Sequence, residues 1–332
     1  MIQKILVIGF GSIGKRHVAN LLEIGKYRIS IVSRKTLSPA DSKEFHVFSS
    51  IDEAYVNDVF DAVIICTPTA QHMQDLQAVW ESGARNIYLE KPISNNYTGI
   101  EAFCEKINTE KCNICVGYDL HFDPGFMKVK ELVEQNEIGN VLSANATVGQ
   151  YLPDWRPHEN YKEGMSASVE KGGGVLLDLI HEIDYIYCLL GKPALITAQN
   201  INSGSLGIET EELAEILVKF QNGALATIHL DYLQPALVRN CRLTGTGGSI
   251  FWNPVTAEVK WMRHDKKEFN FNYAAYTRND RFKEIMHAFL EDKNDPRLTS
   301  FKEAMVSLKM VLAAKKAAAE NSYIDPGKMN FA

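Results

Sequence analysis

One short stretch combines a strand-like apolar run with a lysine suited to catalysis. Residues 86–89 are β-prone, and they end abruptly in Glu90-Lys91-Pro92. In an open α/β sheet, ligands bind just beyond the carboxyl ends of the strands. Lys91 is therefore predicted to face a ligand crevice, where the cofactor-binding half of the protein meets the substrate-binding half. Pro92 fixes its own φ and disfavours the helical region for Lys91, which holds the lysine's backbone in place. The alternative is a solvated lysine in a strand-to-helix loop.

A second cluster places a histidine between two acids. Within a helix predicted over about residues 174–190, Asp178 and Asp184 lie three residues before and after His181. Residues three apart share one helix face, and a carboxylate beside an imidazole fixes its tautomer and raises its pKa. His181 would then be a usable acid or base near neutral pH. The glycine run 172–174 allows close backbone approach before the helix starts. A structural helix histidine is the alternative.

A glycine-rich turn near the amino terminus predicts a dinucleotide site. Residues 5–8 read as a buried parallel strand, and a predicted helix opens directly after them. In this context Gly9 allows the tight turn, Gly11 lets the backbone approach a pyrophosphate, and Gly14 lets the helix pack on the strand. The helix N-terminus supplies amide donors to the phosphates. The predicted cofactor contacts here are Gly9, Phe10, Gly11, Ser12, Ile13 and Gly14.

The end of the next strand bears on the choice between NAD and NADP. An acidic residue there would bind the ribose 2′-hydroxyl, but this chain has Ser33-Arg34-Lys35. A hydroxyl and two cations suit a 2′-phosphate, so NADP is the preferred prediction and NAD the alternative. A loop expected to pass beside the cofactor follows a further strand. The remaining predicted cofactor contacts are Thr67, Pro68, His72, Glu90 and Lys91.

A polar, aromatic passage over residues 154–162 is hard to assign to regular structure. Trp155 and Tyr161 are suited to stack on a ring, and Arg156 and His158 to meet a carboxylate or phosphate. These four residues, with Lys91, Asp178 and His181, form the predicted substrate site. A solvated loop is the alternative.

Composition is that of an ordinary globular chain. The 332 residues are 45% hydrophobic and 23% charged, which is enough for a sizeable core and about two domains. A net charge of −6 argues against a nucleic-acid partner, and six scattered cysteines do not form a disulfide framework. No run approaches 18 apolar residues and no leader pattern is seen, so we expect a cytoplasmic protein without a membrane partner. We predict no metal site.

Strands and helices alternate up to about Gly117, which is the signature of a doubly wound parallel sheet. Beyond Gly139, alternating apolar strands with glycine-rich joints predict a large, mostly antiparallel sheet, with further helices over 126–133, 281–290 and 301–319. We therefore expect a dinucleotide-binding domain over residues 1–117 and an α+β substrate domain over residues 118–332.

Together these residues make the chain similar to the family of glucose–fructose oxidoreductase and inositol 2-dehydrogenase (Gfo/Idh/MocA). The resemblance covers nearly the whole chain. It rests on the glycine turn, Thr67-Pro68 with His72, Glu90-Lys91-Pro92, Val116-Gly117-Tyr118, and Gly172–Gly174 followed by Asp178 and His181. Family members often separate this aspartate and histidine by three residues, where only Leu179 and Ile180 intervene here. His121-Phe122 stands where many members have Arg-Phe, so His121 is not among the predicted site residues.

The resemblance implies hydride transfer between a nicotinamide and a secondary alcohol or ketone carbon of a sugar, cyclitol or nucleotide sugar. It implies that Lys91 orients the substrate and helps relay the proton, that His181 is the general acid or base, and that Asp178 supports it. It also implies an open-faced sheet often used in oligomer contacts, hence a homodimer or homotetramer. The loop over 154–162 resembles that of members encoded for surface-polysaccharide sugars.

Two alternatives remain from the sequence. One is a non-catalytic, dinucleotide-dependent sugar-sensing regulatory or binding protein, against which the intact Lys91 and His181 argue. The other is a reductase of an unsaturated or tetrapyrrole-like substrate, against which the polar loop argues.

Overall fold

The chain divides into two compact units in a computed structural model that describes residues 2–34 and 36–329. The first unit comprises residues up to Asp119 together with Arg278–Met305, and the second comprises Leu120–Thr277 and the residues from Val306 on. This division differs from the predicted one, which placed residues 278–305 in the second domain. The reason is packing: Phe282 and Lys283 contact Arg16 and Glu23 on the first helix of the chain.

The first unit is built on a parallel sheet. Its strands are β1 (Lys4–Ile8), β2 (Arg28–Val32), β3 (His46–Phe48), β4 (Ala62–Ile65), β5 (Asn86–Leu89), β6 (Asn113–Val116) and β15 (Thr299–Ser300). They lie in the order β15-β6-β5-β4-β1-β2-β3, and only β15 runs antiparallel to its neighbour. The central strands β1, β4 and β5 are almost entirely buried, as expected where helices cover both faces. The predicted doubly wound sheet is confirmed.

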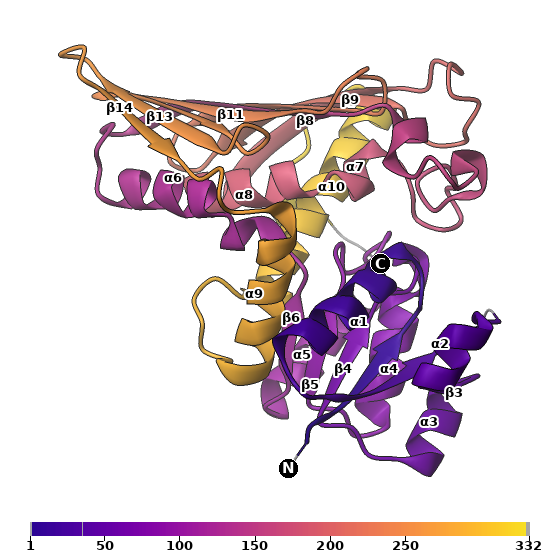
Figure 1. Cartoon of the computed structure of the whole chain (residues 1–332). Helices are drawn as coiled ribbons and strands as arrows, with labels where there is room; N and C mark the ends of the chain where they lie inside the picture. Colours follow the sequence, from indigo (N-terminus) through magenta and orange to yellow (C-terminus); the bar gives the residue numbers. More distant parts are fainter. Residues whose placement is uncertain (1, 35, 330–332) are drawn as a thin grey trace. The chain divides into compact units, whose positions relative to one another are not determined.

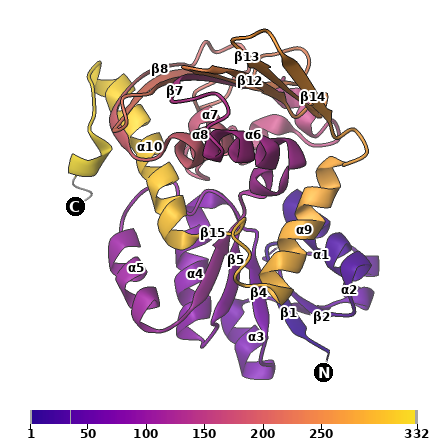
Figure 2. The ribbon, with the colours of Figure 1, turned by 90° about the vertical axis from the view of Figure 1, so that its left-hand side faces the viewer.

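Helices cover both faces of this sheet. They are α1 (Ser12–Ile24), α2 (Pro39–Glu44), α3 (Ile51–Asn57), α4 (His72–Glu81), α5 (Ile100–Thr109) and α9 (Arg278–Glu291). Figure 2 shows α4 and α5 on one side of the strands and α1 with α9 on the other. Both faces of the sheet are therefore shielded from solvent, and side chains can meet a ligand at its carboxyl edge.

The second unit contains a mostly antiparallel sheet of eight strands. These are β7 (Val141–Gly149), β8 (Pro193–Ile201), β9 (Leu213–Phe220), β10 (Leu225–Asp231), β11 (Val238–Gly245), β12 (Gly248–Asn253), β13 (Glu258–Arg263) and β14 (Glu268–Asn272). Their order is β14-β13-β12-β11-β7-β10-β9-β8, and only β7 and β10 pair in parallel. The large antiparallel sheet is confirmed.

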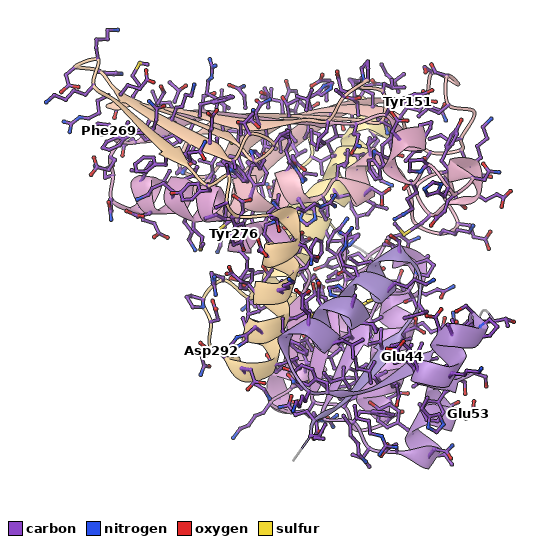
Figure 3. All side chains as sticks on the ribbon, in the orientation of Figure 1. Glu44, Glu53, Tyr151, Phe269, Tyr276 and Asp292 are labelled. Carbon is purple, nitrogen blue, oxygen red and sulfur yellow. The ribbon has the colours of Figure 1, made fainter. Side chains whose placement is uncertain are left out.

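One face of this sheet is covered by helices and the other is open. The covering helices include α6 (Pro124–Glu134), α7 (Val175–Asp178) and α8 (His181–Leu190), which lie under the sheet in Figure 1. Burial alternates residue by residue along β9 and β10, so every second side chain points to the open face. Figure 3 shows side chains standing along that face, with Tyr151 and Phe269 labelled toward opposite ends of the sheet.

The single helix predicted over residues 174–190 is two helices in the structure. The backbone leaves helical geometry at Leu179 (φ −98°, ψ 28°), and the amide of Glu182 bonds to the carbonyl oxygen of Leu179, three residues back. Asp178 therefore ends one helix and His181 begins the next. The last helix, α10 (Phe301–Glu320), starts in the first unit and continues in the second. No helix within the described residues is long and apolar enough to cross a membrane.

Candidate functional site

The candidate cofactor site lies at the carboxyl edge of the parallel sheet in the first unit. Ile8 is in register with Val32 and with Ile65, and Ile65 is in register with Leu89. Because these strand ends are aligned, the residues that follow them emerge side by side. The pairing continues into the loops, where Gly9 N bonds to Val32 O and Glu90 N bonds to Ile65 O. The sheet register therefore places the glycine turn and the lysine loop at the same edge of the sheet, on either side of the end of β4.

The glycine turn leaves room for a ligand at one position only. Gly9 has φ +90°, and a Cβ on Gly14 would lie 2.1 Å from Gly9 O, so both positions need glycine for the turn itself. A Cβ on Gly11 would meet nothing within 4 Å. Gly11 is also the N-cap of α1 and makes no side-chain cap hydrogen bond to the amides of that helix start. Open space before an uncapped helix N-terminus fits the pyrophosphate of a dinucleotide. Phe10, Ser12 and Ile13 belong to the same turn.

Arg34 is held at the end of β2 by an acid that the sequence did not point to. Its Nη2 lies 3.1 Å from Oδ1 of Asp75 on α4, and its Nη1 bonds to Oε1 of Gln71. The Asp75 side chain is 2% exposed, whereas that of Arg34 is 57% exposed. The guanidinium is thus anchored on one side and open to solvent on the other. Ser33 lies beside it and pairs its amide with Phe48 O. Lys35 lies outside the described residues.

His72 joins two loops at this edge. Its Nδ1 lies 2.6 Å from Pro92 O and its Nε2 lies 2.8 Å from Thr67 O. The residue is 1% exposed, and burial lowers the pKa of the ring. Both ring nitrogens therefore face main-chain oxygens, and His72 links the Thr67-Pro68 loop to the loop of Lys91.

Glu90 turns its carboxylate into the unit and meets a histidine. His17 Nε2 lies 2.7 Å from Glu90 Oε1, and both residues are buried. The charge of Glu90 adds to burial in raising the pKa of the Cys66 thiol. Lys91 is half-buried, and the Lys91–Pro92 peptide bond is cis. Sequence reasoning missed His17, although its place one turn after Gly14 on the same helix was visible.

The second glycine turn, before α7, is filled by the protein itself. A Cβ on Gly174 would lie 2.4 Å from Glu211 Oε1, and one on Gly173 would lie 2.2 Å from Met165 O. Glu211 also accepts a hydrogen bond from Leu176 N at 3.3 Å. The close approach predicted for this turn is real, but the group that approaches is a protein carboxylate.

Asp178 is connected to Trp155 through a tyrosine that sequence reasoning missed. Tyr232 donates its hydroxyl to Asp178 Oδ2 at 2.7 Å, and its ring lies edge-on to Trp155 with centroids 5.3 Å apart. Burial and the Asp178 carboxylate raise the pKa of Tyr232 well above its ordinary value. The only sequence signal for Tyr232 is an aromatic at a strand end.

His181 is half-buried at the first turn of α8, and the neighbouring Asp178 and Asp184 bond to Tyr232 and His121. Asp184, on the same face, places Oδ2 2.7 Å from His121 Nε2 and accepts a hydrogen bond from Ser307 Oγ at 2.8 Å. His121, left out of the prediction, thus belongs to the polar cluster at the start of α8.

The remaining predicted substrate residues lie in the loop after β7. Arg156 and His158 are exposed, with Arg156 Nε 4.0 Å from Glu159 Oε2. Tyr161 donates its hydroxyl to Leu206 O at 3.0 Å, so this ring is tied to a neighbouring loop. The described residues contain no group of three or more histidine, cysteine or acidic side chains able to hold a metal ion.

A parallel sheet with a glycine turn open to a ligand defines a dinucleotide-binding protein, and sequence comparison agrees. Residues 3–118 match the family model "Oxidoreductase family, NAD-binding Rossmann fold", and residues 126–251 match the "GFO/IDH/MocA C-terminal domain". The chain therefore belongs to the Gfo/Idh/MocA family of oxidoreductases.

Two curated relatives and one solved structure are similar to this chain over most of their length. The chain is 29% identical over 284 residues to an uncharacterized oxidoreductase, YrbE, of Bacillus subtilis, covering 80% of each chain. It is 24% identical over 338 residues to myo-inositol 2-dehydrogenase of Thermotoga maritima, covering 96% of each. Its fold is similar to that of levoglucosan dehydrogenase in complex with NADH, with a TM-score of 0.85, 19% identity, and coverage of 99% of this chain and 100% of that one.

Proposed function

We propose that this protein transfers a hydride between a nicotinamide and a secondary alcohol or ketone carbon of a sugar, cyclitol or nucleotide sugar. The proposal rests on the open space at Gly11, which lies at the same carboxyl edge of the parallel sheet as the Glu90–Lys91 loop. The relatives named as inositol dehydrogenases and the neighbour named as levoglucosan dehydrogenase support this substrate class. A role in surface-polysaccharide sugar metabolism is part of the proposal and rests on the loop over 154–162.

Each proposed catalytic group has a separate task. The bound cofactor supplies the hydride donor or acceptor at its nicotinamide. The Lys91 ammonium stabilises the alkoxide that develops as the hydride moves, which is a task for a fixed cation. His181 takes or gives the hydroxyl proton. Asp178, which accepts a hydrogen bond from Tyr232, supports His181 in this role. The proposed sugar contacts are Trp155, Tyr161, Arg156 and His158.

We further propose that the protein prefers NADP to NAD. The exposed guanidinium of Arg34, anchored by Asp75, is suited to bind a 2′-phosphate beside the Ser33 hydroxyl. We expect Arg34→Ala to weaken NADPH binding about tenfold, which is the loss of one charge-assisted contact, and to leave NADH binding unchanged. Fluorescence titration measures both. Arg28→Ala, at the exposed start of β2, is the control. Tighter binding of NADH than NADPH by the unchanged protein would reverse the preference.

The central test is substitution of Lys91. We expect Lys91→Ala to lower kcat by about 10²- to 10³-fold, because a fixed cation at the developing charge is lost, while the Kd for NADPH changes by less than about threefold. Turnover is measured with a panel of sugars, cyclitols and nucleotide sugars, and exposed Lys26→Ala is the control. Unchanged turnover in the variant would remove Lys91 from the mechanism. Tight NADPH binding with no turnover on any panel member would favour the regulatory alternative.

We also propose a homo-oligomer, a dimer or tetramer, formed through the open face of the eight-stranded sheet. Leu195, Leu217 and Leu225 lie on neighbouring strands there and are 38%, 38% and 46% exposed. Light scattering on the purified protein, compared with a Leu217→Asp variant, tests whether this face holds copies together. A monomer in the unchanged protein would rule the assembly out.

A further inference from the structure

Two buried histidines hold the residues on either side of Lys91. His17 on α1 contacts the carboxylate of Glu90, and His72 on α4 contacts the carbonyl oxygen of Pro92. We propose that His17 and His72 are positioning residues that fix the backbone of Lys91 in the first unit. The inference rests on the function proposed for Lys91 and extends it to two residues that the chemistry itself does not require.

The His17 contact is the main support for the Glu90 side chain. His17 is 0% exposed and Glu90 is 7% exposed, so the carboxylate has lost most of its water. A buried carboxylate needs hydrogen-bond donors. His17 Nε2 lies at 2.7 Å, whereas the Tyr88 hydroxyl is at a longer 3.4 Å. The ring of His17 is itself packed edge-on against Tyr88 and Phe282. Its position is therefore set by the core.

The space around this carboxylate is also limited near Gly117. A Cβ on Gly117 would lie 3.2 Å from Glu90 Oε1 and 2.6 Å from the Tyr88 hydroxyl. The Glu90 carboxylate thus occupies space that a side chain at residue 117 would need. Removing its donor would leave the carboxylate no equivalent place inside the unit, so the loop would have to move.

The His72 contact fixes the other end of the same loop. Its ring touches Pro92 O through Nδ1 and Thr67 O through Nε2, and it is 1% exposed. Because it starts α4, its backbone belongs to a regular element and not to either loop. Neither histidine is exposed enough to meet a substrate. Both therefore act through the backbone that carries Lys91.

The same helix serves both parts of the proposed site. The start of α1, after Gly11, offers the amides expected to bind the pyrophosphate, and His17 follows within two turns. One rigid element thereby sets the phosphate position and, through Glu90, the loop of Lys91. A misplacement of about 1 Å at a reacting group costs about a hundredfold in rate, so this coupling bears directly on turnover.

The experiment compares two substitutions of His17 in the full-length protein. His17→Phe keeps the ring packing and removes the donor, whereas His17→Gln keeps a donor near the Nε2 position. Hydrogen–deuterium exchange is followed by mass spectrometry in peptides that cover residues 89–96, with the other strands of the sheet as internal reference. His287→Phe, exposed on α9, is the matched control.

We expect His17→Phe to raise amide exchange over residues 89–96 by about tenfold without raising it across the sheet, because only the local support is lost. His17→Gln is expected to restore slow exchange, and the Kd for NADPH is expected to stay within about threefold in both. A uniform rise across the sheet, or no rise over residues 89–96, would overturn the positioning role of His17.

His72 has a corresponding pair of variants. His72→Asn keeps a donor near Nδ1 for Pro92 O, and His72→Phe removes it. The same local rise is expected for phenylalanine and not for asparagine; equal exchange in the two would overturn the role of His72.

Turnover provides a second readout for His17. On a substrate that Lys91→Ala no longer converts, we expect kcat per NADPH site to fall by about 10- to 100-fold in His17→Phe and to recover in His17→Gln. Because exchange does not depend on turnover, failure of the positioning role and failure of the proposed reaction are seen separately.

Discussion

The two glycine turns of this protein look alike in sequence and differ in what fills them. Gly9–Gly14 leads into α1 and Gly172–Gly174 leads into α7, and neither helix receives a side-chain cap from the residue before it. At Gly11 nothing lies within 4 Å of where a Cβ would be, whereas at Gly174 the Glu211 carboxylate lies 2.4 Å away. The space at the first turn is open, and the space at the second is filled by a protein carboxylate.

The comparison shows that a glycine reports close approach but not the identity of the group that approaches. A helix N-terminus attracts an anion in either case. In the second turn that anion is Glu211, whose carboxylate also lies 3.7 Å from Lys315 Nζ. The difference between the turns can be tested by adding methyl groups to them one at a time.

The largest effect is expected from filling the second turn. A methyl group at Gly173 would lie 2.2 Å from Met165 O and 2.5 Å from Ser166 O, both of them backbone atoms. We expect Gly173→Ala to lower the free energy of unfolding by about 3 kcal/mol, because the backbone must shift to relieve the overlap. Thermal unfolding followed by circular dichroism measures the change. A melting temperature equal to that of the unchanged protein would mean that this turn is not close-packed.

The first turn should respond in the opposite way. Gly11 has φ −78° and ψ −166°, a conformation open to alanine, and the space around it is empty. We expect Gly11→Ala to leave stability within about 0.5 kcal/mol but to weaken NADPH binding by about 10- to 100-fold, because the pyrophosphate can no longer approach the backbone. Fluorescence titration and thermal unfolding together check both halves. Unchanged NADPH affinity would show that the open space is not the phosphate site.

A smaller effect is expected from removing the charge of Glu211. Glu211→Gln keeps the shape of the side chain and removes its charge at the start of α7. We expect a loss of about 1 kcal/mol in unfolding free energy and no change in NADPH affinity, since this turn binds no cofactor phosphate. Chemical denaturation and NADPH titration measure the two quantities. A fall in NADPH affinity would contradict the separation of roles between the turns.

An effect of similar size, confined to lower pH, concerns another internally satisfied charge of the second unit. His229 places Nδ1 2.6 Å from Glu215 Oε1 and Nε2 2.8 Å from Asp231 Oδ2. The hydrogen bond to Asp231 first, and then that to Glu215, raises the pKa of His229 to about 9. A raised folded-state pKa gives stability that is full below the unfolded value near pH 6.5 and is lost as the pH rises through about 9.

We therefore expect His229→Gln to cost about 1 kcal/mol at pH 6 and nearly nothing at pH 10. The figure is kept small because Glu215 is 57% exposed and its attraction is screened. Unfolding by urea at both pH values measures the difference. An equal cost at pH 6 and pH 10 would mean that the ring carries no charge in the folded protein.

The sequence by itself determined the fold class and the cofactor turn. The apolar runs before Gly9, Cys66 and Glu90 are buried, and their nearly continuous hydrophobicity predicts parallel strands without reference to tertiary structure. The order strand, glycine turn, helix is local, so Gly9, Gly11 and Gly14 could be assigned roles from spacing alone.

Only the tertiary structure decided which polar groups meet. Asp75 reaches Arg34, Tyr232 reaches Asp178, and His17 reaches Glu90, across 41, 54 and 73 residues of sequence. Local spacing suggested pairing Asp178 with His181 on one helix, but the chain breaks that helix at Leu179. A hydrogen bond depends on a separation of about 3 Å, which strand register and helix packing set and sequence separation does not.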